Sequence, residues 1–184
     1  MRLKAIKLKS VDSTNNIAIK LIKKGEIYPS IILATKQTKG RGQYGRKWIS
    51  LKNNLFISIY FEIGFKKSIK KATIENCQIV KSVLENFSKK KIYIKYPNDL
   101  LMDKNKKVCG ILQETLIYKK KKYIIVGIGI NVNKKPKIND YSTSYLSEFT
   151  SKRINKLLVY NGIKISYENF LRNKYENNRR YRKY

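Results

Sequence analysis

A run of glycine and arginine between residues 38 and 48 constrains this chain more than any other stretch. It reads Thr-Lys-Gly-Arg-Gly-Gln-Tyr-Gly-Arg-Lys-Trp and ends at the single tryptophan of the chain, Trp48. Glycine lets a backbone approach a ligand closely, and arginine presents paired donors that match carboxylate and phosphate oxygens. The run lacks the Gly-Lys-Ser/Thr of a P-loop and the Gly-x-Gly-x-x-Gly order of a dinucleotide turn. It therefore predicts either an anion-binding loop or an ordinary basic surface loop, and the flanking sequence has to distinguish the two.

The composition indicates one globular domain spanning residues 1–184. A chain of 184 residues with 42% hydrophobic residues is large enough to bury a proper core. No apolar run approaches the roughly 18 residues of a membrane span. The N-terminal residues are too charged for a signal peptide. We therefore expect a soluble, cytoplasmic protein that does not interact with membranes.

The net charge of +30 is compatible with nucleic-acid binding, since 42 basic residues face only 12 acidic ones. The lysines are spread along the whole chain, however, and isoleucine, asparagine and tyrosine are also plentiful. That mixture indicates a general bias toward A/T-rich codons. We prefer this explanation and keep a nucleic-acid-binding protein as the alternative.

The residue types present restrict the chemistry. Histidine is absent, which excludes Ser-His-Asp and Cys-His catalysis and histidine-containing metal sites. Cys77 and Cys109 lack the spacing of a zinc knuckle or redox pair, so we expect reduced, buried thiols. Catalysis must then rely on lysine, arginine, aspartate, asparagine and backbone dipoles. This favours electrostatic catalysis on a phosphate or acyl-phosphate substrate.

Hydrophobic periodicity predicts alternating strands and helices. The predicted strands are 3–11, 31–35, 55–63, 92–95, 100–102, 108–113, 115–118 and 123–126, with hairpins at 103–106 and 119–122. The predicted helices are one that begins near residue 15 and stops at Gly25, one at 68–88, and two short ones at 145–146 and 167–175. Gly127 and Gly129 continue a strand, which predicts that something packs closely against its backbone. The basic tail, 179–184, is expected to be frayed.

Three polar clusters lie between these elements, and each has an ordinary structural explanation. Residues 12–15, Asp-Ser-Thr-Asn, can simply cap the first helix. Residues 95–99, Lys-Tyr-Pro-Asn-Asp, can form a plain turn at the proline. Lys107, just inside a strand beside Gly110, can be an edge lysine that points to water. None of these clusters predicts a function alone.

In order and spacing, five segments together resemble the biotin protein ligases, enzymes that attach biotin to a carrier-protein lysine. The segments are 12–15, 37–48, 95–99, 107–114 and 127–131, and they lie within residues 10–135. The resemblance implies an α/β fold of the α+β type, with a mixed, largely antiparallel sheet flanked by helices. Class II aminoacyl-tRNA synthetases and lipoate ligases have related catalytic domains.

The resemblance also implies a reaction and partners. Biotin would be activated with ATP and Mg²⁺ as biotinyl-AMP, then transferred to a lysine of a biotin carboxyl carrier protein, an acetyl-CoA carboxylase subunit. Lipoate or octanoate ligation or transfer ranks lower, because those families lack the Gly-Arg-Gly-x-x-Gly-Arg-x-Trp run that begins at Gly40. A decayed, non-catalytic relative is a further alternative.

Residue roles follow from the same resemblance. The catalytic cations would be Lys107 and Arg41. The residues that contact biotin would be Ser13, Thr14, Asn15, Gln37, Gly40, Arg41, Gly42, Gln43, Lys107 and Gly110. The residues that contact ATP would be Arg41, Arg46, Trp48, Lys95, Asn98, Asp99 and Asn131, with Asp99 also contacting Mg²⁺.

The chain departs from the family pattern at several points. Gln43 stands where the family usually has a third arginine, which predicts a weaker grip of the loop on the adenylate. Tyr96 replaces the usual tryptophan before the Pro-Asn-Asp turn. Too few residues follow Tyr175 for the small C-terminal barrel of many relatives, and too few precede Leu3 for a helix-turn-helix. We therefore expect a minimal, ligase-only form, for which a homodimer through sheet edges is compatible with the resemblance.

Overall fold

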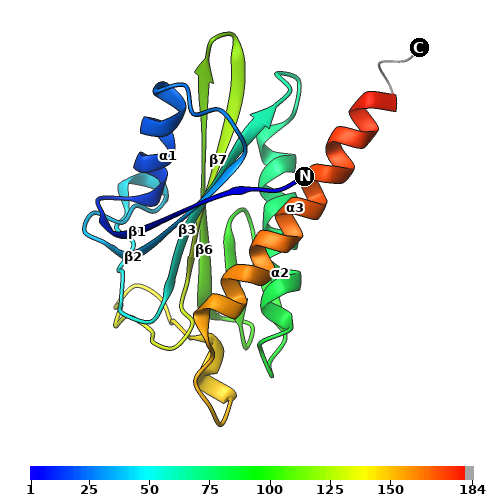
Figure 1. Ribbon diagram of the computed structural model, residues 1–184. Helices are drawn as coiled ribbons and strands as arrows, with labels where there is room; N and C mark the ends of the chain where they lie inside the picture. Colours follow the sequence, from blue (N-terminus) through cyan, green and yellow to red (C-terminus); the bar gives the residue numbers. More distant parts are fainter. Residues whose placement is uncertain (181–184) are drawn as a thin grey trace.

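The computed structural model describes residues 1–180, with side chains up to residue 176, and is built around one seven-stranded mixed sheet (Figure 1). The strands, in spatial order, are β1 (Lys4–Val11), β2 (Ser30–Gln37), β3 (Leu55–Ile63), β7 (Lys121–Ile130), β6 (Lys106–Tyr118), β5 (Asp99–Met102) and β4 (Ile92–Lys95). The β1–β2 pair is parallel, and the other neighbouring pairs are antiparallel. The predicted fold class is confirmed.

Helices cover both faces of the sheet. Helix α1 (Thr14–Lys23) lies on one face, and α2 (Ile69–Glu85) and α3 (Lys156–Arg180) lie together on the other (Figure 1). Strand β3 shows how one sequence serves both layers, because successive side chains of a strand point to opposite faces. Ile57 and Ile59 belong to the core under α2 and α3, whereas Tyr60 packs in a smaller core under α1.

Helix α1 has the boundaries that its sequence predicts. Ala18 and Ile22, one turn apart, are fully buried against the sheet. The helix ends before Gly25, whose φ of +89° lies in the left-handed region that glycine adopts most easily. The N–H of Gly25 donates to the carbonyl of Ile22 and closes the last turn.

Strands β6 and β7 are longer than the short strands predicted for this part of the chain. The predicted strands 108–113 and 115–118 form one continuous strand, paired with β7 from Cys109–Ile130 to Tyr118–Lys121. The predicted break fell at Glu114, directly after the polar residue Gln113. Both polar residues have partners inside the structure, so the strand continues through them: Gln113 bonds to α2 and Glu114 to the α1 side. The predicted hairpin at 119–122 is confirmed.

The C-terminal third also differs from prediction. The helix expected at 145–146 is a short 3₁₀ turn, Leu146–Phe149. The helix expected at 167–175 is part of α3, which already begins at Lys156. Four of its fully buried residues recur every four positions, at Val159, Ile163, Tyr167 and Leu171, but lysine and asparagine between them obscure the pattern. Residues 181–184 of the predicted frayed tail lie outside the described residues.

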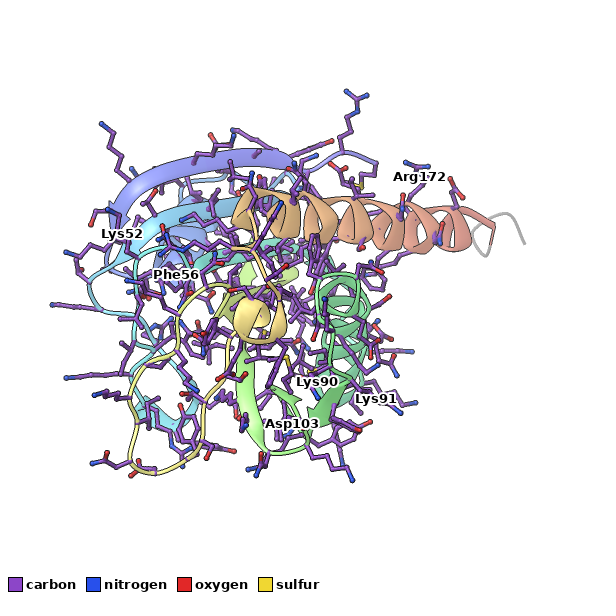
Figure 2. All side chains as sticks on the ribbon, turned by 90° about the horizontal axis from the view of Figure 1, so that it is seen from below. Lys52, Phe56, Lys90, Lys91, Asp103 and Arg172 are labelled. Atoms are coloured by element: carbon purple, nitrogen blue, oxygen red, sulfur yellow. The ribbon has the colours of Figure 1, made fainter. Side chains whose placement is uncertain are left out.

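Basic side chains are spread over the surface. Figure 2 shows charged side chains projecting around the whole periphery, with Lys52, Lys90 and Arg172 at widely separated points. Within residues 1–180, no helix is both long and apolar enough to cross a membrane.

Candidate active site

A cavity of about 250 Å³ opens on the α1 face of the sheet and draws on all five segments singled out in the sequence. Its walls come from the start of α1, the glycine–arginine loop, the turn before β5, and the facing parts of β6 and β7. These parts are far apart along the chain. The sheet order places β6 beside β7, and α1 packs across both, so the fold itself assembles the site.

Glycines form the floor of this cavity. A side chain at Gly127 would collide with the Asn15 amide, and one at Gly129 would collide with the Trp48 indole. At Gly110, which pairs with Gly129, an added Cβ would lie 2.8 Å from Trp48 Cζ3. Asn15 and Trp48 can therefore lie against the sheet backbone itself. The prediction of close packing at Gly127 and Gly129 is confirmed.

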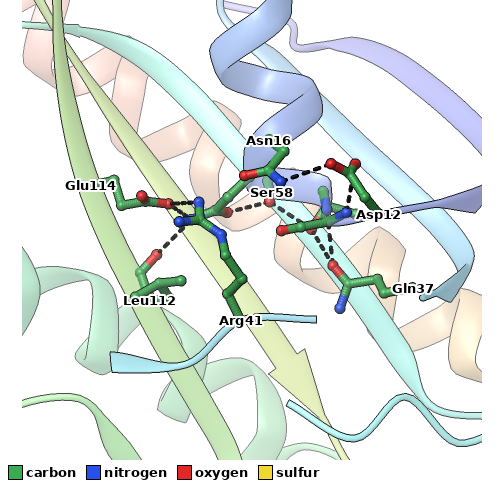
Figure 3. A network of polar contacts seen from close by, with 10 residues as sticks. Asp12, Asn16, Gln37, Arg41, Ser58, Leu112 and Glu114 are labelled. Atoms are coloured by element: carbon green, nitrogen blue, oxygen red, sulfur yellow. Dashed lines mark hydrogen bonds and ion pairs between the residues drawn. The ribbon is translucent and has the colours of Figure 1, made fainter. Parts of the chain in front are cut away.

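A buried hydrogen-bond network joins α1 to β2 and β3. The N–H and hydroxyl of Thr14 both donate to Gln37 Oε1, at 2.9 and 3.0 Å. The hydroxyl of Ser58 lies between Thr14 Oγ1, at 2.7 Å, and Asn15 Oδ1 (Figure 3). Ser58 was not predicted as a site residue. A serine between two buried isoleucines of a strand was the available signal.

Capping explains only part of the Asp12–Asn15 cluster. Ser13 occupies the N-cap position of α1, yet within residues 1–180 its side chain makes no capping bond. Asp12 is engaged instead, accepting from the Asn16 side chain at 2.8 Å and from the Ser13 N–H at 2.8 Å. The hydrogen bond from Asn16 is the largest cause that holds the pKa of Asp12 below its ordinary value. Ser13 is thus left facing the cavity, which it lines.

Arg41 crosses from the loop to β6. Its Nη2 atom lies 2.6 Å from Glu114 Oε2, and the Asn15 side-chain amide donates to the same oxygen at 2.7 Å (Figure 3). The Asn15 amide also donates to the Leu112 carbonyl. Glu114 belongs to a segment of the family pattern but was not predicted as a site residue. It ties the loop, the first turn of α1 and β6 together.

Lys107 does not point to water. Its Nζ atom lies 2.8 Å from Asp99 Oδ1 as an ion pair, and the two side chains are only 17% and 22% exposed. The ammonium also lies 5.7 Å from the ring centre of Trp48 and 5.2 Å from that of Tyr141. The ordinary explanation of an edge lysine is therefore wrong. Tyr141, in the loop after β7, was missed by sequence reasoning.

The remaining predicted contacts divide into two groups. Gln43, Arg46 and Lys95 line the cavity with exposed or half-buried side chains, and Gly42 lines it with its backbone. Asn98 also lines it, but its amide donates to the Ile111 carbonyl at 3.0 Å and so fixes the turn before β5.

Two predicted residues lie outside the cavity lining. Gly40 closes the base of the loop, where its carbonyl accepts from the Trp48 N–H at 2.9 Å. Asn131 is buried, and its amide donates to the Ser144 carbonyl and accepts from Asn54. It borders a smaller hollow behind Trp48 and Lys107. Asn131 therefore supports the wall of the site.

The fit to Mg²⁺ is limited to one carboxylate. Within residues 1–180 no group of three or more acidic or thiol side chains is arranged to hold a metal ion. Asp99 offers a carboxylate whose buried Oδ1 accepts no hydrogen bond from the described residues, although Lys107 is close. Mg²⁺ usually keeps several waters and binds through one or two carboxylates plus substrate phosphates. The residues present therefore fit a Mg²⁺ ion that is coordinated mainly by substrate phosphates and water.

The two cysteines lie in the core on the opposite face of the sheet. Cys77 and Cys109 are free and fully buried, as predicted. Burial raises the pKa of Cys77 to about 11 and raises that of Cys109 as well. Neither thiol lines the cavity.

Comparison with known proteins identifies the family of this chain. Residues 8–131 match the Biotin/lipoate A/B protein ligase family, so the chain belongs to that family. The bifunctional ligase/repressor BirA of Bacillus subtilis is 30% identical over 167 residues, which cover 86% of this chain and 50% of that protein. This chain thus spans about half the length of the BirA relative.

Solved structures of this family share the fold. The biotin protein ligase from Aquifex aeolicus, in complex with biotin and ATP, aligns with a TM-score of 0.74 and 32% identity. The alignment covers 90% of this chain and 69% of that one. P. falciparum LipL1 in complex with lipoate aligns with a TM-score of 0.61 at 12% identity over 92% of this chain and 63% of that one, which shows a shared fold.

Proposed function

We propose that this protein is an ATP-dependent biotin–protein ligase. Its family and its likeness to an Aquifex aeolicus ligase that binds biotin and ATP support this proposal. The observation that carries it is the composition of one cavity, in which a buried neutral hydrogen-bond network and two carboxylate-paired cations meet. Such a site suits a ligand with both a polar, uncharged ring and an anionic group.

Biotin has those two features. Its ureido ring carries N–H donors and a carbonyl acceptor, which can exchange hydrogen bonds with Ser13, Thr14, Asn15 and Gln37. Its carboxylate matches the cations Arg41 and Lys107. Because these side chains are already fixed by Ser58, Glu114 and Asp99, little reorganisation accompanies binding.

In the first half-reaction, a carboxylate oxygen of biotin attacks the α-phosphorus of ATP. The bond from that phosphorus to the bridging oxygen breaks, and pyrophosphate leaves. Negative charge increases on the phosphate oxygens in the transition state, where Lys107 and Arg41 stabilise it. Asp99 would hold Mg²⁺, which would supply neutralisation of the phosphate charge.

The nucleotide would lie over the side of the cavity formed by Trp48 and its neighbours. Arg46 and Lys95 are exposed cations at the rim, and Asn98 fixes the turn that presents Asp99. Asn131 takes part indirectly, through the wall behind Trp48 and Lys107. The glycine–arginine loop shields the mixed anhydride from water, which would otherwise hydrolyse it.

In the second half-reaction, the amine of a carrier-protein lysine attacks the acyl carbon of biotinyl-AMP. The bond from that carbon to the phosphate oxygen breaks, an amide forms and AMP leaves. The acceptor is a biotin carboxyl carrier protein. Residues 1–184 form a single catalytic domain, and the reaction takes place in the cytoplasm.

Lipoate or octanoate ligation is the second candidate, because the family description includes lipoate ligases and LipL1 shares the fold. The polar network around Thr14 favours biotin, since an alkyl chain or a dithiolane ring offers it no hydrogen bonds.

The test is covalent transfer measured by mass spectrometry. The protein is incubated with ATP, Mg²⁺, a biotin carboxyl carrier domain and biotin, lipoate or octanoate in parallel. We expect the mass of one biotinyl group on the carrier lysine and none with the other acids. Transfer of lipoate or octanoate in place of biotin would contradict the proposal.

A further inference from the structure

Two side chains directed at the cavity converge on one carboxylate oxygen. Glu114 Oε2 accepts from Arg41 Nη2 at 2.6 Å and from Asn15 Nδ2 at 2.7 Å (Figure 3). Arg41 belongs to the glycine–arginine loop, Asn15 to the first turn of α1, and Glu114 to the middle of β6. One atom, Glu114 Oε2, therefore connects the glycine–arginine loop and the first turn of α1 to strand β6.

We propose that Glu114 is a positioning residue, which holds Arg41 and Asn15 in the geometry that the ligand requires. This inference rests on the proposed function for what Arg41 and Asn15 bind. Glu114 itself acts through the other two residues and need not touch the substrate.

The pairing leaves Arg41 able to bind a ligand. A guanidinium has five N–H donors in a fixed plane, and the bond to Glu114 uses Nη2. The donors on the other nitrogens keep a direction set by that bond. Charge-assisted bonds between arginine and carboxylate are the stronger hydrogen bonds of proteins, so one contact can fix the orientation of the whole group.

The charge of Glu114 matters because its surroundings are basic. Arg41 lines the cavity together with Arg46, Lys47 and Lys107, in a chain with only 12 acidic residues against 42 basic ones. Without a carboxylate nearby, repulsion from these cations would drive the Arg41 guanidinium toward water. Asp99 pairs with Lys107, which leaves Glu114 to balance Arg41.

Asn15 depends on Glu114 in a different way. Its Oδ1 accepts from Ser58, and its Nδ2 donates to both Glu114 and the Leu112 carbonyl. These three contacts fix which way the amide faces above Gly127, where there is room for it only because that residue is glycine. Loss of Glu114 would thus loosen the ring-binding and the anion-binding parts of the site together.

The first experiment is a double-mutant cycle on biotin-dependent exchange of labelled pyrophosphate into ATP. The variants are Glu114→Ala, Arg41→Ala and the double variant, with Glu85→Gln as control because Glu85 pairs with Lys81 on α2. We expect each single change to lower kcat/KM about tenfold or more, and the loss in the double variant to be clearly smaller than the product of the two single losses, because Glu114 acts partly through Arg41. Losses that multiply, or a fully active Glu114→Ala, would overturn the proposal.

A conservative variant separates positioning from general destabilisation. Glu114→Gln keeps an acceptor oxygen but removes the charge. Since charge-assisted bonds are about twice as strong as neutral ones, we expect it to lose only part of the activity that Glu114→Ala loses. Thermal melting of both variants should match that of the control. Equal losses in both variants, together with a lowered melting temperature, would make Glu114 merely structural and overturn the proposal.

Hydrogen exchange of the loop gives a readout that needs no activity. In the native protein the Gly42 and Trp48 amides donate within the loop, to Arg46 and Gly40. We expect amides 39–48 to exchange faster in Glu114→Ala than in the native protein or Glu85→Gln. Unchanged exchange would contradict the positioning role. Should the native protein activate no acid at all, the proposed function fails while this measurement still tests Glu114.

Discussion

Lys107 Nζ lies 2.8 Å from Asp99 Oδ1, so that an ion pair joins neighbouring strands β6 and β5 at the wall of the cavity. The aromatic rings of Trp48 and Tyr141 flank the ammonium. Electrostatic interactions are stronger in such partly dehydrated surroundings than in water. A cation held there is suited to stabilise charge that develops on a transferring group.

Lys107→Ala should lower the rate of biotin-dependent pyrophosphate exchange by about 100-fold or more, because it removes a preorganised cation from the transition state. Lys106→Ala is the matched control, since Lys106 is more exposed and pairs with Asp103 in the hairpin turn. The control should keep its activity. Equal rates for Lys107→Ala and the native protein would refute the catalytic role of Lys107.

Gly129→Ala should displace Trp48. The new methyl group would collide with the indole, which lies against the strand, and overpacking of this kind costs about 1–3 kcal/mol. Trp48 is the single tryptophan, so its emission reports the change directly. We expect a shift of emission toward that of exposed indole, together with weaker exchange activity.

Gly64→Ala is the control for that substitution, because a Cβ at Gly64 meets no atom of the described residues within 4 Å. Its emission and activity should remain those of the native protein. An unchanged spectrum for Gly129→Ala would show that Trp48 does not need the space.

We predict that Lys174 makes the free energy of unfolding depend on pH. Its Nζ lies 5.0 Å from the Phe61 ring centre and 3.3 Å from the Glu62 carbonyl. Burial, with a smaller effect from Lys67, lowers the pKa of Lys174 from 10.5 to about 8. Between these two values the unfolded chain binds more protons at this residue, so its contribution makes the free energy of unfolding rise with pH. Below pH 8 the residue is charged in both states, and the folded state bears the whole cost of burying the charge.

Lys174→Met removes that cost. Urea unfolding at several pH values measures the free energy of unfolding of this variant and of the native protein. We expect the advantage of the variant to be largest near pH 7 and to decline as the pH rises toward 10.5. Arg172→Met on the same helix is the control, because arginine stays charged over this range and its effect should not change. A constant difference for Lys174→Met would contradict the lowered pKa.

Cys77 and Cys109 should react slowly with a thiol reagent at pH 8 in the folded protein. Both are fully buried, and burial raises the pKa of Cys77 to about 11, so little thiolate is present. Labelling in urea should be complete. Rapid labelling of either thiol in the folded protein would show that the core opens more readily than its packing indicates.

The convergence of the five segments could be predicted from sequence, whereas the contacts within the site could not. Gly127 and Gly129 predicted close packing, because glycine within a strand often marks a site where another group approaches the backbone. No sequence pattern predicted that Asn15 and Trp48 are the residues that pack there. That pairing depends on the way α1 and the loop cross the sheet, which is a property of the tertiary structure.

Glu114 and Ser58 were missed for a related reason. A strand with polar residues at 113 and 114 resembles two short strands with a break, so the periodicity concealed which face Glu114 takes. The pairing of Glu114 with Ile125 places it on the α1 face. Asn131 differs from its neighbour in the strand, because Gly129 lines the cavity whereas the Asn131 amide donates to the Ser144 carbonyl.

The central claim is most directly tested by the exchange of labelled pyrophosphate into ATP, with biotin, lipoate and octanoate offered separately in the presence of Mg²⁺. Exchange shows that an acid has been activated as its adenylate, without any need for the carrier protein. We predict exchange with biotin and none with lipoate or octanoate. Folded protein that shows no exchange with biotin would contradict the account, and exchange with lipoate or octanoate alone would place the protein with the other ligases of its family.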